Sequence, residues 1–165
     1  MIIRDNQSEQ TTMTASLIDK GIISPMTDFN FYHLIEVRYG DLDPQGHVNN
    51  AKYLTYIEQG RIFYLKHLKL WESGSFLDIG VIMADVQMTF KKAIQFGDPI
   101  RVGVRISRLG HKSLDSEYCI EDTRDAGVLA TATSVLVTYD YRKNRSVPIP
   151  EAWRKAMMLF EGMAE

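Results

Sequence analysis

The segment Gly40–Tyr53, which reads GDLDPQGHVNNAKY, is the richest polar stretch of the chain. Its Asp43 carboxylate is a candidate general base or nucleophile, and the His47 imidazole is a second candidate base. An apolar pattern begins directly after the segment and predicts a helix that starts at Asn49 or Asn50. The free amides and the dipole of a helix start stabilise negative charge. A carboxylate beside such amides is a minimal site for acyl transfer, because the amides can hold the oxyanion of a reacting carbonyl.

The same residues also suit a plain turn followed by a helix cap. Asp, Pro, Gly and Asn before a helix favour turns, so Asp41 is equally an Asx-turn residue and Asn49 or Asn50 a cap. His47 is in that case a hydrogen-bond partner or a loop residue. Gly46 would let the backbone approach a ligand closely. From the residues alone, the catalytic and the structural interpretation both stay open.

The elements that must position this segment are predicted from hydrophobic periodicity. Alternation over 29–39 predicts a strand, and apolar spacings of three and four up to Leu68 predict a long helix. Further alternating runs predict strands at Gly80–Lys91, Ile100–Arg108, Leu114–Glu121 and Val128–Tyr141. A final amphipathic helix follows Pro150. Short turns favour antiparallel neighbours, so the order predicts an α+β fold in which one curved antiparallel sheet wraps around one long helix.

The composition fits one ordinary domain of 165 residues, with residues 1–28 as an N-terminal extension and residues 29–165 as the domain. The 19 basic and 21 acidic side chains give a net charge of −2, which argues against a nucleic-acid partner. The lone Cys119 excludes an intrachain disulfide and a cysteine cluster for zinc. Neither a secretory h-region nor an apolar run long enough to span a membrane occurs. We therefore expect a cytoplasmic protein without a membrane partner.

The segment GDLDPQGHVNNAKY resembles the N-terminal signature of hotdog-fold acyl-CoA thioesterases of the 4-hydroxybenzoyl-CoA thioesterase type. The following YLTYIEQGRIFYL continues the resemblance along the predicted helix, and the element order over Phe29–Tyr141 resembles the hotdog fold. The resemblance implies hydrolysis of an acyl-CoA to a free carboxylic acid and coenzyme A, with no cofactor and no metal. It also implies a homo-oligomer, either a dimer or a dimer of dimers, whose site lies at the subunit interface.

Residue by residue, the resemblance assigns the catalytic carboxylate to Asp43 and a structural or supporting role to Asp41. It implies an oxyanion contact from the backbone amides near Asn50 or Ala51. The HVNN sequence departs from the bulkier apolar and aromatic residues of the type enzyme, so aromatic acyl specificity is not implied.

HVNN also occurs in thioesterases that act on acyl carrier protein. Their acid, amide and imidazole would correspond to Asp43, Gln45 and His47, with Gln45 in place of the usual asparagine. An acyl-ACP thioesterase is therefore one alternative. A non-catalytic module that binds acyl thioesters is another, although retention of Asp43 favours an enzyme. A hydratase or dehydratase of the same fold is disfavoured. The resemblance implies that such enzymes have a longer spacer between their Asp and His than the one between Asp43 and His47.

The sequence offers further candidate site residues besides Asp43, His47, Asn50 and Ala51. Glu58 is a second candidate catalytic carboxylate, since a related hotdog lineage uses a helix glutamate, but an ion pair with Arg61 explains it equally. The candidate substrate-binding residues are Gly46, Asn49, Tyr53, Tyr56 and Ile57. The candidate cations for the phosphates of coenzyme A include Arg108, Lys112 and Arg142.

Overall fold

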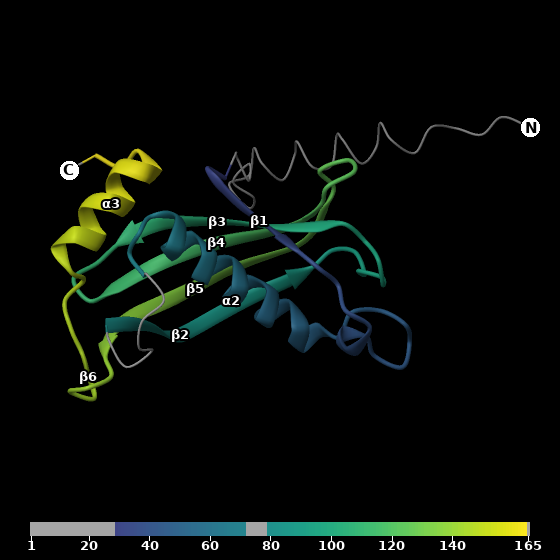
Figure 1. The fold of residues 1–165 in the computed structure, drawn as a ribbon, viewed down its shortest axis with the longest axis horizontal. Helices are drawn as coiled ribbons and strands as arrows, with labels where there is room; N and C mark the ends of the chain where they lie inside the picture. The colour runs from purple at the N-terminus through teal and green to yellow at the C-terminus, as the bar shows by residue number, and fades with distance from the viewer. Residues whose placement is uncertain (1–28, 72–78, 165) are drawn as a thin grey trace, which may run out of the picture.

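The structure is a computed structural model that describes residues 29–71 and 79–164; the predicted extension 1–28 lies outside these residues. A curved antiparallel sheet in the order β1-β3-β4-β5-β2 carries one long helix, α2, on one face (Figure 1). The chain order is β1 (Phe31–Ile35), a 3-10 turn η1 (Tyr39–Asp41), α2 (Asn50–His67), β2 (Ile79–Phe90), β3 (Ile100–Leu109), β4 (Ser113–Asp122), β5 (Val128–Asp140), β6 (Arg145–Ser146) and α3 (Glu151–Glu161). The predicted α+β hotdog architecture is confirmed. None of the described helices is long and apolar enough to cross a membrane.

The first strand is shorter than its alternating pattern predicts. Its ladder with β3 ends where Ile35 pairs with Ile100, the first residue of β3. Pro99 precedes Ile100 and has no N–H to donate, so the predicted strand residues beyond Ile35 lack a ladder partner on β3. The chain instead enters η1, and this early departure carries it toward the start of α2.

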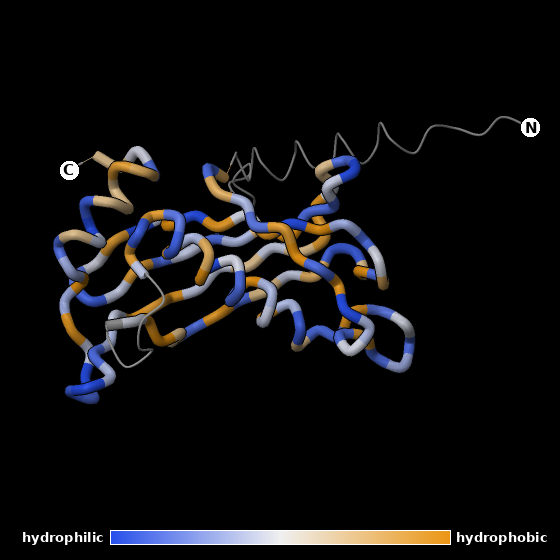
Figure 2. The backbone as a smooth tube through the Cα atoms, viewed as in Figure 1, coloured by the Kyte–Doolittle hydropathy of each residue, from blue (hydrophilic) through white to orange (hydrophobic). Residues whose placement is uncertain are grey.

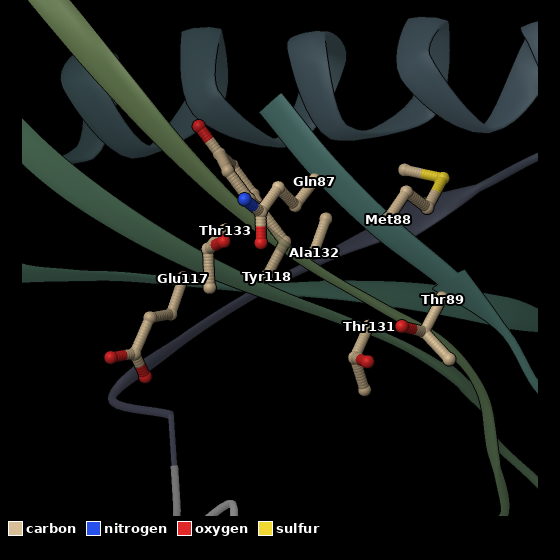
Figure 3. A pocket seen from close by; sticks show the side chains of 8 residues that line it. All are labelled: Gln87, Met88, Thr89, Glu117, Tyr118, Thr131, Ala132 and Thr133. Atoms are coloured by element: carbon tan, nitrogen blue, oxygen red, sulfur yellow. The ribbon is translucent and has the colours of Figure 1, made fainter. Parts of the chain in front are cut away.

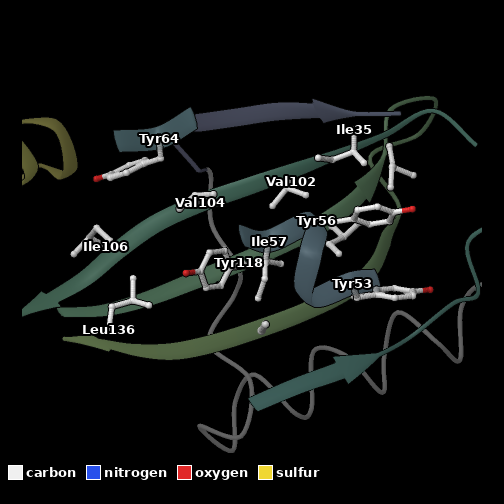
Figure 4. Close-up of a cluster of buried hydrophobic side chains, with 14 of the residues drawn as sticks. Ile35, Tyr53, Tyr56, Ile57, Tyr64, Val102, Val104, Ile106, Tyr118 and Leu136 are labelled. Carbon is white, nitrogen blue, oxygen red and sulfur yellow. The ribbon is translucent and has the colours of Figure 1, made fainter. Parts of the chain in front are cut away.

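The core lies between α2 and the sheet (Figure 4). Tyr53, Ile57 and Tyr64 of α2 are buried against the inward side chains of the strands, which alternate with outward polar residues. Figure 2 shows the same pattern along the chain, with apolar stretches in the strands and hydrophilic turns at their ends. Gly60 allows the close approach of α2, because a Cβ built there would lie 2.9 Å from Cγ1 of Val102.

The C-terminal helix α3 covers the end of the sheet that lies away from the start of α2 (Figure 1). It is the predicted amphipathic helix, and it buries Trp153 and Met157. Its last residue, Glu161, accepts hydrogen bonds from the Tyr64 hydroxyl at 2.6 Å and from the backbone N–H of Ile106 at 3.0 Å. Burial and this carboxylate raise the pKa of Tyr64, so its hydroxyl stays a donor that ties α2 to α3.

Candidate active site

Asp43 is the first residue of a tight loop that ends at His47. The backbone N–H of Asp43 donates to the carbonyl of His47 at 2.8 Å, and the N–H of Gly46 donates to the carbonyl of Asp43 at 3.0 Å. The carboxylate Oδ1 accepts from the backbone N–H groups of Gln45 (2.9 Å) and His47 (3.2 Å). Gly46 has a φ of +82°, which glycine adopts without a steric penalty. The loop therefore fixes the Asp43 carboxylate, which is half-buried, while Gln45 and His47 are exposed.

The loop is joined directly to the first turn of α2. Leu42 and Val48 form an antiparallel bridge, and the N–H of Asn49 donates to the carbonyl of Asp41 at 2.9 Å. The Asn49 side chain caps the helix by accepting from the N–H of Ala51 at 2.9 Å. The N–H of Asn50 has no acceptor within the described part of the chain. Of the two amides that the sequence indicates, Asn50 N–H is therefore the one open to a substrate oxyanion.

The cap can be tested separately from the chemistry. Asn49→Ala removes the acceptor of the Ala51 N–H and should lower the free energy of unfolding by about 1 kcal/mol. Asn49→Asp keeps an acceptor oxygen and adds a charge that the helix dipole favours, so it should retain the stability of the wild type. Urea unfolding of the three proteins measures the effect, and equal stability of the alanine variant would show that the cap contributes nothing.

Asp41 joins the loop to α2 from inside the protein. It is 1% exposed and lies within reach of three cationic or hydroxyl donors. Its carboxylate accepts from the Arg38 backbone N–H (3.1 Å) and guanidinium (3.2 Å) and from the Tyr56 hydroxyl (3.0 Å), and Lys52 Nζ lies 3.5 Å away. Burial by itself would raise the pKa of Asp41, but the hydrogen bonds from Arg38 and Tyr56 outweigh it and lower that pKa. Asp41 is thus an ionised anchor of the loop that carries Asp43.

This anchor predicts an acid-dependent stability. Because the pKa of Asp41 is lowered from its ordinary 3.8 in the folded state, its contribution is present above pH 3.8 and is lost as the pH falls below that value. Asp41→Asn should cost about 1–3 kcal/mol at neutral pH, with the gap to the wild type closing below pH 3.8. Urea unfolding across this range measures the gap, and a gap that does not depend on pH would contradict an ionised Asp41.

The candidate substrate-binding aromatics are part of the core. Tyr53 is 2% exposed and packs edge-on against Phe90 of β2 at 5.0 Å between ring centroids. Ile57 is fully buried, and the Tyr56 hydroxyl is committed to Asp41. Tyr53, Tyr56 and Ile57 therefore pack the first turns of α2 against the core. Gly46 and Asn49, in contrast, are exposed near Asp43 in the loop and at the helix cap.

Glu58 does not belong to this group of residues. Its side chain is 62% exposed and lies 3.4 Å from Nη2 of Arg61, the ion pair that its spacing predicts. Glu58 follows Asn50 by eight residues of helix, about 12 Å along the axis. The structure therefore does not bring Glu58 to the carboxylate of Asp43.

The candidate cations for coenzyme A lie at the other end of the sheet. β3 leaves the Asp43 end at Ile100, and Arg108 follows after about 26 Å of strand. Arg108 pairs with Asp115 at 2.6 Å, and Lys112 donates to the carbonyl of Ser146 at 3.5 Å. Arg142 follows the end of β5. Within one subunit, therefore, none of the three reaches Asp43.

Two grooves among the described residues have no contribution from Asp43 and lie over β2, β4 and β5, the smaller one reaching Ser107 of β3. Figure 3 shows the larger. The larger, of about 470 Å³, is lined by residues that include Gln87, Glu117 and Thr133, on strand positions that alternate with the inward Tyr118 and Ala132. The described residues contain no cluster of three or more His, Cys, Asp or Glu side chains suited to a metal ion. The start of α2 is the candidate active site because the loop joins the Asp43 carboxylate to the helix start, where the N–H of Asn50 is open.

Comparison with known proteins gives consistent matches. A family model described as the thioesterase-like superfamily matches residues 37–157. The chain is 34% identical to a thioesterase from Thermus thermophilus solved in complex with coenzyme A and Zn, covering 83% of this chain and 98% of that one with a TM-score of 0.71.

Two curated proteins are also similar. The long-chain acyl-CoA thioesterase FadM of Escherichia coli is 22% identical over 74% of this chain and 93% of its own length. Bacillus subtilis YsmA, an uncharacterized protein, is 28% identical over 58% of this chain, which spans 64% of the length of YsmA.

The fold and these matches define the class as hotdog-fold thioester hydrolases. Within that class, the chain belongs to the thioesterase-like superfamily. The matched residues 37–157 include the whole Asp43 loop and all of α2.

Proposed function

We propose that this protein is an acyl-CoA thioesterase that hydrolyses an acyl-CoA to a free carboxylic acid and coenzyme A. The observation that carries the proposal is the Asp43 carboxylate, which its loop attaches to the helix start where the N–H of Asn50 is open. A thioester carbonyl oxygen that accepts from Asn50 N–H has its developing negative charge stabilised there by the helix start.

Asp43 then acts by one of two routes. As a general base, it takes a proton from a water whose oxygen attacks the thioester carbon, and the C–S bond breaks to release the thiolate of coenzyme A. As a nucleophile, its carboxylate oxygen attacks the same carbon, the C–S bond breaks to release the thiolate of coenzyme A, and water then hydrolyses the resulting anhydride to the acid and free Asp43. Both routes consume one water and end in the same products, and neither requires a cofactor.

A homodimer would bring Arg142, which lies far from Asp43 within one subunit, toward the Asp43 of the other subunit. β2 is an edge strand, and Phe90 on it and Leu54 on α2 are exposed large apolar residues. Antiparallel pairing of two β2 edges would set the Phe90 end of one strand against the Ile79 end of its partner. Because Ile79 pairs with Asp140, the turn that carries Arg142 would then approach the Asp43 end of the other subunit. We propose that this turn helps to bind the phosphates of coenzyme A across the interface.

Two alternatives use the same site. An acyl-ACP thioesterase would hydrolyse an acyl group carried on acyl carrier protein, and a non-catalytic module would bind the thioester without cleaving it. We propose a cytoplasmic location for the protein.

Free thiol release from a panel of acyl-CoAs, short to long and aromatic, tests the function, with acyl-ACP substrates run beside it. The proposal predicts multiple turnovers with at least one acyl-CoA. Turnover of acyl-ACP but of no acyl-CoA would identify an acyl-ACP thioesterase. Binding of acyl-CoA without thiol release would identify a non-catalytic binding module. Light scattering at several protein concentrations gives the oligomeric state, for which we expect a dimer or a dimer of dimers.

A further inference from the structure

Arg61 of α2 is a buried cation whose hydrogen bonds are incomplete. Its side chain is 8% exposed, and its Nη2 lies 3.4 Å from Glu58. Its Nε and Nη1 atoms are buried and have no hydrogen-bond partner. Unsatisfied buried donors destabilise a fold, so the position of Arg61 calls for an acceptor that the described residues do not supply.

Arg61 lies on the side of α2 that faces β4 and β5. Helix α2 approaches β1 and β3, and on the β1 side Gln59 lies 3.1 Å from His33 and Phe63 stacks on the His33 ring at 3.8 Å. Arg61 follows Gln59 by two residues, about 200° around the helix, and so lies on the opposite side. That side is turned toward β4 and β5.

The inward residues of β5 in this region are small, and they face Tyr118 and Ile120 of β4 at the end nearer to Phe90. Ser116 and Ser134 are register partners, both are buried, and the Oγ of Ser116 has no hydrogen-bond partner. Ser134 lies 3.2 Å from the Tyr118 hydroxyl. Ala130 and Ala132 continue the same face of β5 toward the end near Phe90 and Tyr53, where the candidate active site lies. A line of small side chains on β5 therefore leads from the end of the sheet near the start of α2 to the buried hydroxyls of Ser134 and Ser116.

We propose that Arg61 and Ser116 form the polar end of the acyl-binding region, and that the preferred substrate has an acyl group with an oxygen acceptor at its far end. This inference rests on the proposed function. Arg61 lies eleven residues after Asn50, about 16 Å along the helix axis, so the acyl group must be extended. A terminal hydroxyl or carboxylate would accept from the unpaired N–H groups of Arg61, and a plain alkyl end would leave them unsatisfied.

Binding of non-hydrolysable thioether analogues tests the inference without requiring turnover. The probes are the analogues of lauroyl-CoA, ω-hydroxylauroyl-CoA and ω-carboxylauroyl-CoA, and the readouts are Kd by calorimetry and Tm. We expect the wild type to bind at least one oxygenated analogue about tenfold more tightly than the lauroyl analogue, the effect of about one net hydrogen bond. The two oxygenated probes distinguish a neutral from an anionic acceptor.

Three variants separate recognition from folding. Arg61→Met should abolish the preference for oxygenated analogues without lowering Tm, because it removes unsatisfied donors, and Arg61→Lys should keep part of the preference. Ser116→Ala should reduce the preference and leave Tm unchanged, since its hydroxyl has no partner to lose. Lys155→Met on α3, an exposed position, is the control and should behave as the wild type.

The outcomes of the inference and of the proposed function are distinct. Equal binding of all three analogues by the wild type, or an unchanged preference in both Arg61→Met and Ser116→Ala, overturns the inference. Hydrolysis of acyl-CoAs with no such preference overturns it and leaves the thioesterase in place. If the wild type prefers the oxygenated analogues but hydrolyses none of the parent acyl-CoAs, the polar end of the acyl-binding region is supported and the proposed thioesterase activity is overturned.

Discussion

Asp43→Asn is expected to lower kcat for acyl-CoA hydrolysis by about 10²–10⁴-fold, the contribution typical of a positioned general base. An asparagine amide neither accepts a proton at neutral pH nor attacks the thioester carbon, so both candidate routes stop. KM should change little, because the amide of Asn50, the proposed oxyanion contact, is backbone and stays in place. Initial rates of thiol release at saturating and limiting substrate give kcat and KM.

The asparagine variant should remain folded, because its side-chain oxygen can still accept from the N–H groups of Gln45 and His47. An unchanged Tm verifies this. Asp125→Asn, in the exposed turn between β4 and β5, is the matched control, because its Oδ1 also accepts from a backbone N–H, that of Gly127, and it should keep the rate of the wild type. Full activity of Asp43→Asn would remove Asp43 from the mechanism.

Gly60→Val is expected to destabilise the protein by about 3 kcal/mol, the upper part of the range for overpacked cores. Even a single added Cβ would meet Val102 Cγ1 at 2.9 Å and Val104 Cγ2 at 3.2 Å. Both neighbours are β-branched and stiff, so α2 must move away from the sheet to make room. The gain in helix propensity over glycine is less than about 1 kcal/mol and does not offset this clash.

Urea unfolding of Gly60→Val measures the effect, with Gly40→Val as the control. Gly40 is exposed and has open space around its Cβ position, so its substitution should change stability by no more than about 0.5 kcal/mol. If the two variants were equally stable, the close contact of α2 with β3 would not contribute to the fold.

Local periodicity was sufficient to predict most of the fold. The four later strands and the long helix agree with their patterns to within about two residues at each end. The start of α2 was predictable because its signal, the Asn49 cap, is local. The end of β1 was not, because it depends on where β3 begins, a contact between residues about 65 positions apart.

Burial and pairing within the site were less accessible from the sequence. The i,i+3 spacing of Arg38 and Asp41 is a usable signal for an ion pair, but nothing local indicates that Tyr56 and Lys52 meet the same carboxylate. The preference for Asn50 over Ala51 as the open amide depends on which N–H the Asn49 side chain accepts. The distance from Asp43 to Arg108 follows from strand direction, which residue types do not encode.

A crystal structure of Asp43→Asn with an intact acyl-CoA tests the central claim most directly. We predict that the thioester carbonyl oxygen lies within hydrogen-bond distance of Asn50 N–H, with the thioester carbon facing the side chain at position 43. A thioester bound elsewhere, such as in the groove beside Gln87 and Glu117, would contradict the assignment of the active site to the start of α2.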